Sequence, residues 1–165
     1  MTAVTMNPYA SYLGNQDAVE VLSATAQRLH EIAHAFGEAH INQPLAPGKW
    51  SPREVFIHLA DCELVFGFRY RQALAEENHM MQPFDQDLWA KTYAVYDAHD
   101  ALQTFAVLRN WNLKLIRSLT PEQMSKPVMH PERGKMIFRN LMETAAGHDI
   151  NHLQRLDAAV GNSAA

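Results

Sequence analysis

Four stretches of the chain carry apolar residues three and four positions apart, and this spacing limits the fold more than any other feature of the sequence. Residues spaced in this way share one face of an α-helix, the face that a soluble protein buries. The first stretch covers about residues 17–39 and places on such a face Leu22, Ala26, Leu29, Ala33 and Phe36. Alternating patterns typical of strands are scarce. The chain is therefore predicted to be all-α.

The second stretch has the clearest start signals. Ser51 is a favourable N-cap, Pro52 suits the first helical position, and Glu54 stands where a capping box has Glu or Gln. An apolar stripe follows, made of Val55, Leu59, Cys62 and Phe66. We expect this helix to continue to about Glu77.

Two more helices are predicted in the second half of the chain. One covers about residues 99–119 and the other roughly residues 136–160. Between them, Pro127, Pro131 and Gly134 are typical of a loop. Four amphipathic helices in 165 residues predict a four-helix bundle.

The lengths of the links predict how the helices are ordered. The link over residues 78–98 is long, whereas the other two links between helices are short. A long link can carry the chain back along the bundle, so the second and third helices would run parallel. We therefore expect an up-down-down-up bundle. It would form one domain over residues 1–165, with an N-terminal arm at 1–15 and a C-terminal tail at 161–165.

Composition excludes several classes of protein. The formal net charge is −4, and lysine and arginine are scattered, so the chain lacks the basic stripe of a nucleic-acid-binding protein. No apolar run approaches the ~20 residues needed to span a bilayer. The single cysteine, Cys62, cannot form an internal disulfide, which favours a reducing compartment. We expect a cytoplasmic protein that binds neither nucleic acids nor membranes.

Nine histidines are the one unusual feature of the composition. His148 and His152 are four residues apart, so they project from the same side of the last helix, close to its apolar face. His58 lies on the apolar face of the second helix. Three inward-facing imidazoles can bind one divalent metal ion and leave coordination positions for water or substrate. The spacing fits ordinary hydrogen-bonded core histidines equally well, because it does not show that the two helices are neighbours.

A competing metal motif occurs in the first helix. His30-Glu31-Ile32-Ala33-His34 matches the H-E-x-x-H signature of zinc peptidases, in which Glu31 would be the general base. The apolar stripe of that helix turns His30 and His34 roughly 100–140° away from the core. We therefore interpret both as solvated. The histidines near helix ends or in loops have no ligand spacing, although one of them could line a site; they are His40, His79, His99 and His130.

Three segments of the sequence resemble the DinB-like, also called YfiT-like, family of metal-dependent helical-bundle proteins. They are KWSPREVFIHLAD at residues 49–61, LTPEQMSKPVMHPERG at 119–134 and GHDINHL at 147–153, and the resemblance covers roughly residues 17–160. It implies an up-down-down-up bundle with a three-His site for nickel, zinc or a similar divalent ion. His58 matches the ligand on the second helix, and His148 and His152 match the pair on the fourth.

The resemblance also implies a class of activity. Family members with known activity include thiol-dependent S-transferases and a thiol-dependent isomerase, in which the metal would activate a low-molecular-weight thiol. Relatives often have glutamine three residues after the last ligand, where this sequence has Arg155. The contact that such a glutamine makes is therefore not carried over to this chain.

Three residues near the expected ligands have two interpretations each. Asp61, one turn after His58, could accept a hydrogen bond from a ligand imidazole or could be a surface acid. Cys62 could be a thiolate ligand, but a buried free cysteine is more typical of a small core residue. Trp50 is expected to pack the start of the second helix against the bundle, and a pocket wall is the alternative.

These observations predict a metal-dependent enzyme in which the ion acts as a Lewis acid, of the thiol-dependent transferase or hydrolase type, with a small-molecule substrate. A non-catalytic metal- or ligand-binding bundle of a stress response is the alternative, because no clear general base or nucleophile accompanies the histidines. A homodimer is also expected. The candidates for its interface lie partly off the main stripe of the second helix and are Phe56, Phe68 and Leu74.

Overall fold

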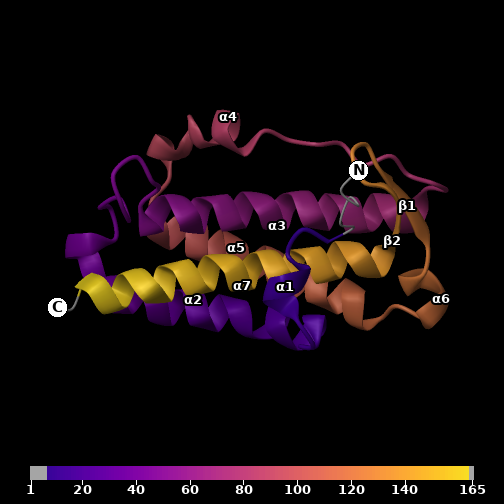
Figure 1. Cartoon of the computed structure of the whole chain (residues 1–165), viewed down its shortest axis with the longest axis horizontal. Helices are drawn as coiled ribbons and strands as arrows, with labels where there is room; N and C mark the ends of the chain where they lie inside the picture. The colour runs from indigo at the N-terminus through magenta and orange to yellow at the C-terminus, as the bar shows by residue number, and fades with distance from the viewer. Residues whose placement is uncertain (1–6, 164–165) are drawn as a thin grey trace.

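Four long helices form the body of the protein in the computed structural model, which describes residues 7–163. They are α2 (Ala18–His40), α3 (Pro52–Ala75), α5 (Ala98–Arg117) and α7 (Phe138–Ser163). Short helical segments lie before and between them: α1 (Ala10–Leu13), α4 (Gln86–Ala90), the 3-10 helix η1 (Tyr93–Val95) and α6 (Pro121–Met124). Figure 1 shows the long helices packed side by side, which confirms the predicted four-helix bundle.

The long helices run in two directions. α2 and α7 run one way, and α3 and α5 run the other (Figure 1). At the start of α3, Arg53 donates to the carbonyl of Tyr96, just before α5, at 2.8 Å. Near the ends of both helices, Arg71 of α3 donates to Asn112 of α5 at 2.8 Å, as a parallel pair requires. α7 packs against both α2 and α3, so the helices that carry the three histidines are neighbours.

Local sequence explains where the helices begin. The Ser51 side chain accepts a hydrogen bond from the backbone N–H of Glu54, and the Glu54 carboxylate accepts one from the backbone N–H of Ser51. The predicted capping box is thereby confirmed. Asp17 caps α2 and Asp97 caps α5 in the same way through their carboxylates. Each cap satisfies a backbone N–H group that has no partner inside its helix.

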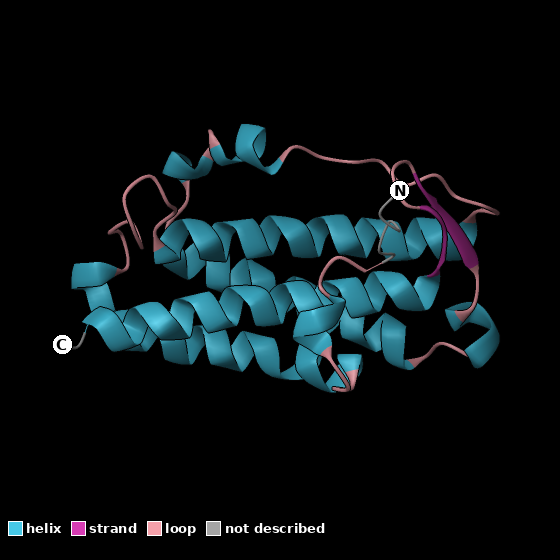
Figure 2. Ribbon diagram, in the orientation of Figure 1, coloured by secondary structure: helices cyan, strands magenta, loops and turns pink. Residues whose placement is uncertain are grey.

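A short antiparallel hairpin precedes α7, where a loop was expected (Figure 2). Its strands are β1 (Pro127–His130) and β2 (Gly134–Ile137). Met136 and Ile137, which the periodicity assigned to the last helix, therefore belong to β2. Val128 and Met136 are partners across the strands and both are buried, so pairing gives the segment its core contacts. Gly134 has a φ of 75°, a conformation that glycine adopts easily and that closes the turn.

The two ends of the chain depart from the predicted arm and tail. Part of the arm predicted at 1–15 is helical, as α1, and residues 1–6 lie outside the described residues. Residues 161–163 of the predicted tail continue α7, and residues 164–165 lie outside the described residues. Among the residues that the structure describes, no helix is long and apolar enough to cross a membrane.

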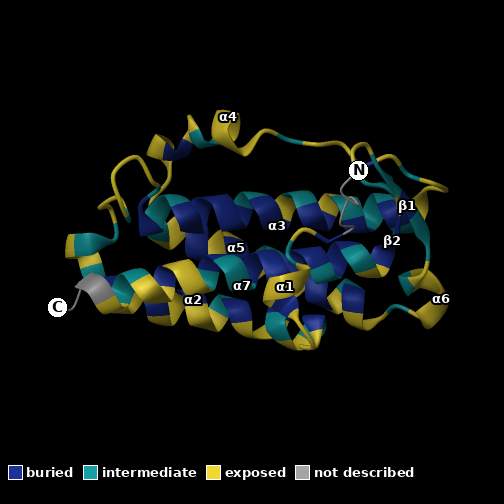
Figure 3. Ribbon diagram, in the orientation of Figure 1, coloured by how far each residue is buried: buried dark blue, intermediate teal, exposed yellow. Residues whose placement is uncertain are grey.

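Buried residues lie mainly on the interior faces of the long helices (Figure 3). One candidate for a dimer interface is among them: Phe56 is only 1% exposed and packs in the same cluster as Tyr93 of η1. Tyr93 belongs to the link between α3 and α5, which passes along the outer side of α3 (Figure 1). Leu74 is half-buried against the core and Phe68 is 55% exposed. Phe56 was therefore wrongly assigned to an interface, and the homodimer stays a prediction.

Candidate metal centre

Three imidazole rings meet inside the bundle. Nε2 of His148 lies 3.2 Å from Nε2 of His58 and 3.2 Å from Nε2 of His152. One nitrogen of each ring lies within 4.8 Å of those of the other two, and all three side chains are buried. The structure therefore brings together the three residues singled out from the sequence, although 90 positions separate His58 from His148.

The helix register explains why these rings converge. The capping box at Ser51 sets where α3 begins, and hence which face of the helix residue 58 occupies. His148 and His152 are one turn apart on α7, so their rings project from the same face, with centroids 4.5 Å apart in an edge-on arrangement. α3 and α7 pack against each other, which places the ring of His58 against both rings of α7.

The spacing of the nitrogens fits a divalent ion. A tetrahedral site with metal–nitrogen bonds of about 2.0–2.1 Å separates its nitrogens by about 3.3 Å, close to the two separations of 3.2 Å. Hydrogen bonds explain the cluster less well, because Nε2 of His148 faces two other imidazole nitrogens and a neutral ring nitrogen is either a donor or an acceptor. A cation shared by the three rings would accept the lone pair of one nitrogen from each ring.

Burial keeps the three rings neutral. Burial, with a smaller contribution from repulsion by a neighbouring imidazole, lowers the pKa of His58, His148 and His152 to about 3 in each case. Imidazole binds a metal in its neutral form, so at neutral pH no proton has to leave before an ion enters.

Two neighbours of His58 do not join the cluster. Sγ of Cys62 lies 3.5 Å from Nε2 of His58, but among the described residues only the three histidines form a set of mutually close ligand atoms. Burial also raises the pKa of the Cys62 thiol, which is consistent with a core residue. The Asp61 carboxyl faces the Tyr93 hydroxyl without a well-aligned hydrogen bond, and burial raises its pKa. Within residues 7–163 it makes no hydrogen bond to an imidazole.

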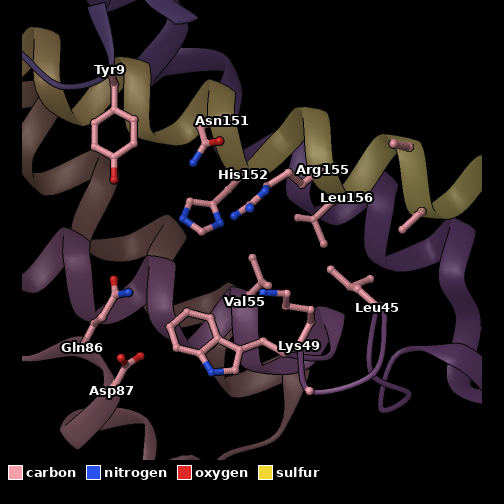
Figure 4. Close-up of a pocket in the computed structure, with 14 residues that line it drawn as sticks. Tyr9, Leu45, Lys49, Val55, Gln86, Asp87, Asn151, His152, Arg155 and Leu156 are labelled. Carbon is pink, nitrogen blue, oxygen red and sulfur yellow. The ribbon is translucent and has the colours of Figure 1, made fainter.

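Two cavities reach the histidines, each lined by different rings. The larger, of about 600 Å³, is lined by His152, Lys49, Trp50 and Arg155, and Figure 4 shows Arg155 and His152 projecting from the same helix toward it. The Trp50 ring centroid also lies 4.9 Å from that of His58, so Trp50 both packs against the bundle and forms a pocket wall.

The smaller cavity, of about 240 Å³, is lined by His58, His148 and Cys62. Tyr9 and Gln86 line both cavities. The centre therefore has space on two sides for a substrate, a thiol or water.

The segment before α2 lies across α7 and covers His148. The ring centroids of Tyr9 and His148 are 5.2 Å apart in an edge-on arrangement. This approach depends on Gly147, because a Cβ at that position would lie 2.5 Å from the Tyr9 carbonyl oxygen. Sequence reasoning missed Tyr9. Gly147, next to His148, could have indicated such a contact. Glycine has a low helix propensity, so a glycine in the middle of a helix often marks a close approach by another part of the chain.

A buried charged network lies beside the cluster. Arg109 of α5 donates to Asp149 of α7 at 2.6 Å and to Glu63 of α3 at 2.9 Å. Thr25 of α2 donates to Asp149 at 2.8 Å, and Asn112 donates to Glu63 at 2.8 Å. The network joins all four long helices and includes the residue next to His148.

This network was also missed from the sequence. Arg109 lies four residues from Phe105 and four from Leu113, which places a charged residue on an apolar face. The guanidinium indeed lies 4.5 Å from the Phe105 ring centroid. A charged side chain on a buried helix face needs a buried partner of opposite charge. The position of Arg109 on an apolar face could therefore have predicted a buried acidic partner.

The competing H-E-x-x-H motif lies on the exposed side of α2. His30, Glu31 and His34 are all exposed, and Glu31 pairs with Arg28 on the same helix. His130, which the sequence placed in a loop, is the last residue of β1 and lines the smaller cavity.

Comparisons with known proteins found a family and relatives that this chain resembles. The family model described as "DinB superfamily" matches residues 22–156. "Putative metal-dependent hydrolase YfiT" of Bacillus subtilis is 26% identical over 152 residues, which cover 87% of this chain and 84% of the relative. A relative from Oceanobacillus iheyensis, also named "Putative metal-dependent hydrolase", is 30% identical over 110 residues, which cover 66% of this chain and 64% of the relative.

A solved structure has the same fold. It is that of YfiT from Bacillus subtilis, described as "a probable metal-dependent hydrolase with an unusual four-helix bundle topology". The TM-score is 0.82 at 20% sequence identity, and the match covers 99% of this chain and 92% of that chain. At this identity the likeness concerns the fold.

Proposed function

The chain belongs to the DinB superfamily, and on that premise we propose that it is a metal-dependent enzyme. Its three-His centre would bind one zinc or nickel ion and activate a water or a low-molecular-weight thiol for hydrolysis or group transfer. The observation that carries the proposal is the meeting of His58, His148 and His152 where two cavities reach them. A divalent ion bound there would supply Lewis acidity and lower the pKa of a bound water or thiol.

The donor set supports zinc or nickel. Neutral imidazole nitrogens suit these borderline ions, whereas magnesium and calcium prefer carboxylate and carbonyl oxygens. Among the described residues, the mutually close ligand atoms include no carboxylate oxygen. Three protein ligands also leave at least one coordination position for a reactant, as in catalytic rather than structural zinc sites.

Other residues of the site have tasks that do not depend on the ion. Trp50 and Leu156 give the larger cavity an apolar wall, while Lys49, Asn151 and Arg155 offer hydrogen-bond donors to a substrate. Tyr9 separates His148 from solvent on the side where the N-terminal segment crosses α7.

The buried network would hold the ligands in position. Arg109 and Thr25 both donate to Asp149, so the turn of α7 that carries His148 is fixed to α5 and α2. A ligand held by a rigid surround keeps the geometry that a metal requires. Asp149 is thus a positioning residue and does not face the reactants.

The test uses protein purified without a histidine tag and loaded separately with zinc and nickel. We expect about one ion per chain in the wild type and a large loss in His148→Ala, because one of three ligands is gone. His34→Ala is the matched control, since His34 is an exposed histidine of α2 and should leave the metal content unchanged.

Activity is measured with a panel of esters and amides and with small thiols paired with an electrophile. Metal-dependent turnover that disappears in His148→Ala supports an enzyme. If about one ion binds but no thiol or substrate is turned over or changes the spectrum of a nickel-loaded sample, the enzyme proposal is wrong. The protein would then be the metal-binding bundle that the sequence left as the alternative.

A further inference from the structure

Two arginines that line the smaller cavity have no carboxylate partner among the residues that the structure describes. Arg69 comes from α3 and Arg133 from the turn between β1 and β2. Within residues 7–163, neither forms an ion pair with a carboxylate. Nε of Arg69 is buried and has no hydrogen-bond partner in that part of the chain. A buried N–H without a partner costs free energy, so a ligand whose acceptor reached this guanidinium would be favoured.

Arg69 is held in a defined orientation. One of its terminal nitrogens donates to the carbonyl of Gln82 at 2.9 Å. Its guanidinium lies 5.9 Å from the ring centroid of Phe66 and 6.0 Å from that of Phe84. A guanidinium held by a hydrogen bond beside two aromatic rings loses little further freedom when it binds a planar anion.

His130 adds a third donor. The backbone N–H groups of Glu132 and Arg133 both donate to Nδ1 of His130, at 3.1 and 3.2 Å. Nδ1 is therefore an acceptor, and the proton of the neutral ring is on Nε2. Burial lowers the pKa of His130. The charges of Arg133 and Arg69 act in the same direction and that of Glu132 opposes them, so the net effect favours this neutral form.

The remaining lining defines the ligand further. Phe66, Met81 and Phe84 form an apolar wall. Glu132 is the only acidic residue among the described residues that line the cavity, so two arginines leave a formal charge of +1. That charge is balanced by a monoanion. A volume of about 240 Å³ corresponds to roughly eight waters of liquid volume, which limits the ligand to a small molecule.

We propose that this cavity binds the carboxylate of a small amphipathic substrate. Arg69 and Arg133 would bind the carboxylate oxygens, and the apolar body would contact Phe66 and Phe84. The same cavity is lined by His58 and His148, so the other end of the molecule lies at the metal centre. The role of substrate rests on the proposed function, but the binding of the anion does not.

The test is a calorimetric titration of 3-phenylpropionate into metal-free protein, with 3-phenylpropanol and 2-phenylethylphosphonate as comparison ligands. The carboxylate should bind, and the alcohol should bind at least about tenfold more weakly, because it lacks the charge. The phosphonate, which carries more negative charge, should bind no more tightly than the carboxylate.

Arg69→Gln and Arg133→Gln should each weaken binding of the carboxylate by about 10- to 100-fold, the loss of one charged hydrogen-bond donor. Lys135→Gln is the matched control. Lys135 lies in the same hairpin, is exposed and does not line the cavity, so its loss changes the net charge equally without changing the site. In wild-type protein, the ring protons of Phe66 and Phe84 should shift in the NMR spectrum when the carboxylate binds, a readout that needs no variant.

Three results would overturn the proposal. The alcohol could bind as tightly as the carboxylate, or the two arginine variants could bind like wild type. The carboxylate could also bind only to metal-loaded protein and be lost in His148→Ala, which would place it on the ion. If metal-free protein binds the carboxylate through the arginines while no turnover is found with the metal, the anion site is supported and the proposed enzyme is not.

Discussion

Arg109 and Asp149 form a buried ion pair, with 2.6 Å between nitrogen and oxygen, one residue away from His148. Glu63 pairs with the same guanidinium at 2.7 Å, and all three side chains are about 3% exposed. The guanidinium therefore faces two buried carboxylates. Burial raises the pKa of Asp149, and the charge of Arg109 opposes that rise.

Replacement of Arg109 by methionine should destabilise the fold strongly. Two carboxylates would remain in the core without a cation, and the loss of one partner from a buried charged group costs about 3–5 kcal/mol. Urea denaturation at neutral pH measures the free energy of unfolding of the variant and of the wild type.

Arg28→Met is the control for this prediction. Arg28 also binds α7, through Asp157 at 3.0 Å, but its side chain is 45% exposed. An exposed pair contributes at most about 1 kcal/mol. If Arg28→Met and Arg109→Met lower the free energy of unfolding equally, burial does not explain the contribution of Arg109 to stability.

The long helices could be predicted from the sequence because their signals are local. The capping box at Ser51 and the apolar spacing of α2 each lie within a few residues, and the structure reproduces both. The contact between His58 and His148 is different. Spacing placed each ring on an apolar face, but only the resemblance to a family implied that the two helices meet.

The missed features depend on tertiary contacts. Strands of four residues are too short for alternation to be recognised, so the hairpin that buries Val128 and Met136 resembled a loop. Arg109 is compatible with a buried face only because Glu63 and Asp149, far away in the sequence, reach it. No local pattern contains that information.

Gly147→Ala should release the segment that carries Tyr9. The added Cβ would lie 2.5 Å from the Tyr9 carbonyl oxygen and 2.7 Å from its Cβ, so the segment has to move away from His148. Amide hydrogen exchange of Leu13 and its neighbours in α1 should become faster, because α1 packs on α7.

The matched control for the glycine variant is Gly161→Ala, on the same helix. A Cβ at Gly161 meets no atom within 4 Å. This change should leave exchange in α1 unaltered and stabilise the helix by up to about 1 kcal/mol, the propensity difference between alanine and glycine. Unchanged exchange in Gly147→Ala would contradict the proposed close approach.

Cys62→Ala should keep the metal content of the wild type. The thiol is buried, its pKa is raised, and it lies outside the cluster of mutually close ligand atoms. His58→Ala, one turn earlier on α3, should lose the ion. Metal analysis of the two purified variants compares them directly. Loss of the metal from Cys62→Ala would identify the thiolate as a ligand.

The metal-free protein should lose stability as the pH falls from about 6.5 toward about 3. Burial holds the pKa of His58, His148 and His152 at about 3, below the value of 6.5 for an unperturbed histidine. Between these values the unfolded chain binds protons that the folded chain does not, so acid favours unfolding. The contribution of the three rings is complete above about pH 6.5 and is lost by about pH 3.

Between about pH 3 and 6.5, each ring adds up to about 1.4 kcal/mol per pH unit to the slope of the free energy of unfolding against pH. Urea denaturation of chelator-treated protein at several pH values between about 3 and 6.5 measures this pH dependence. His152→Leu removes one of the three rings and keeps the buried network, so its free energy of unfolding should depend less steeply on pH. Equal slopes in the variant and the wild type would mean that these imidazoles accept protons in the folded protein as readily as in the unfolded chain.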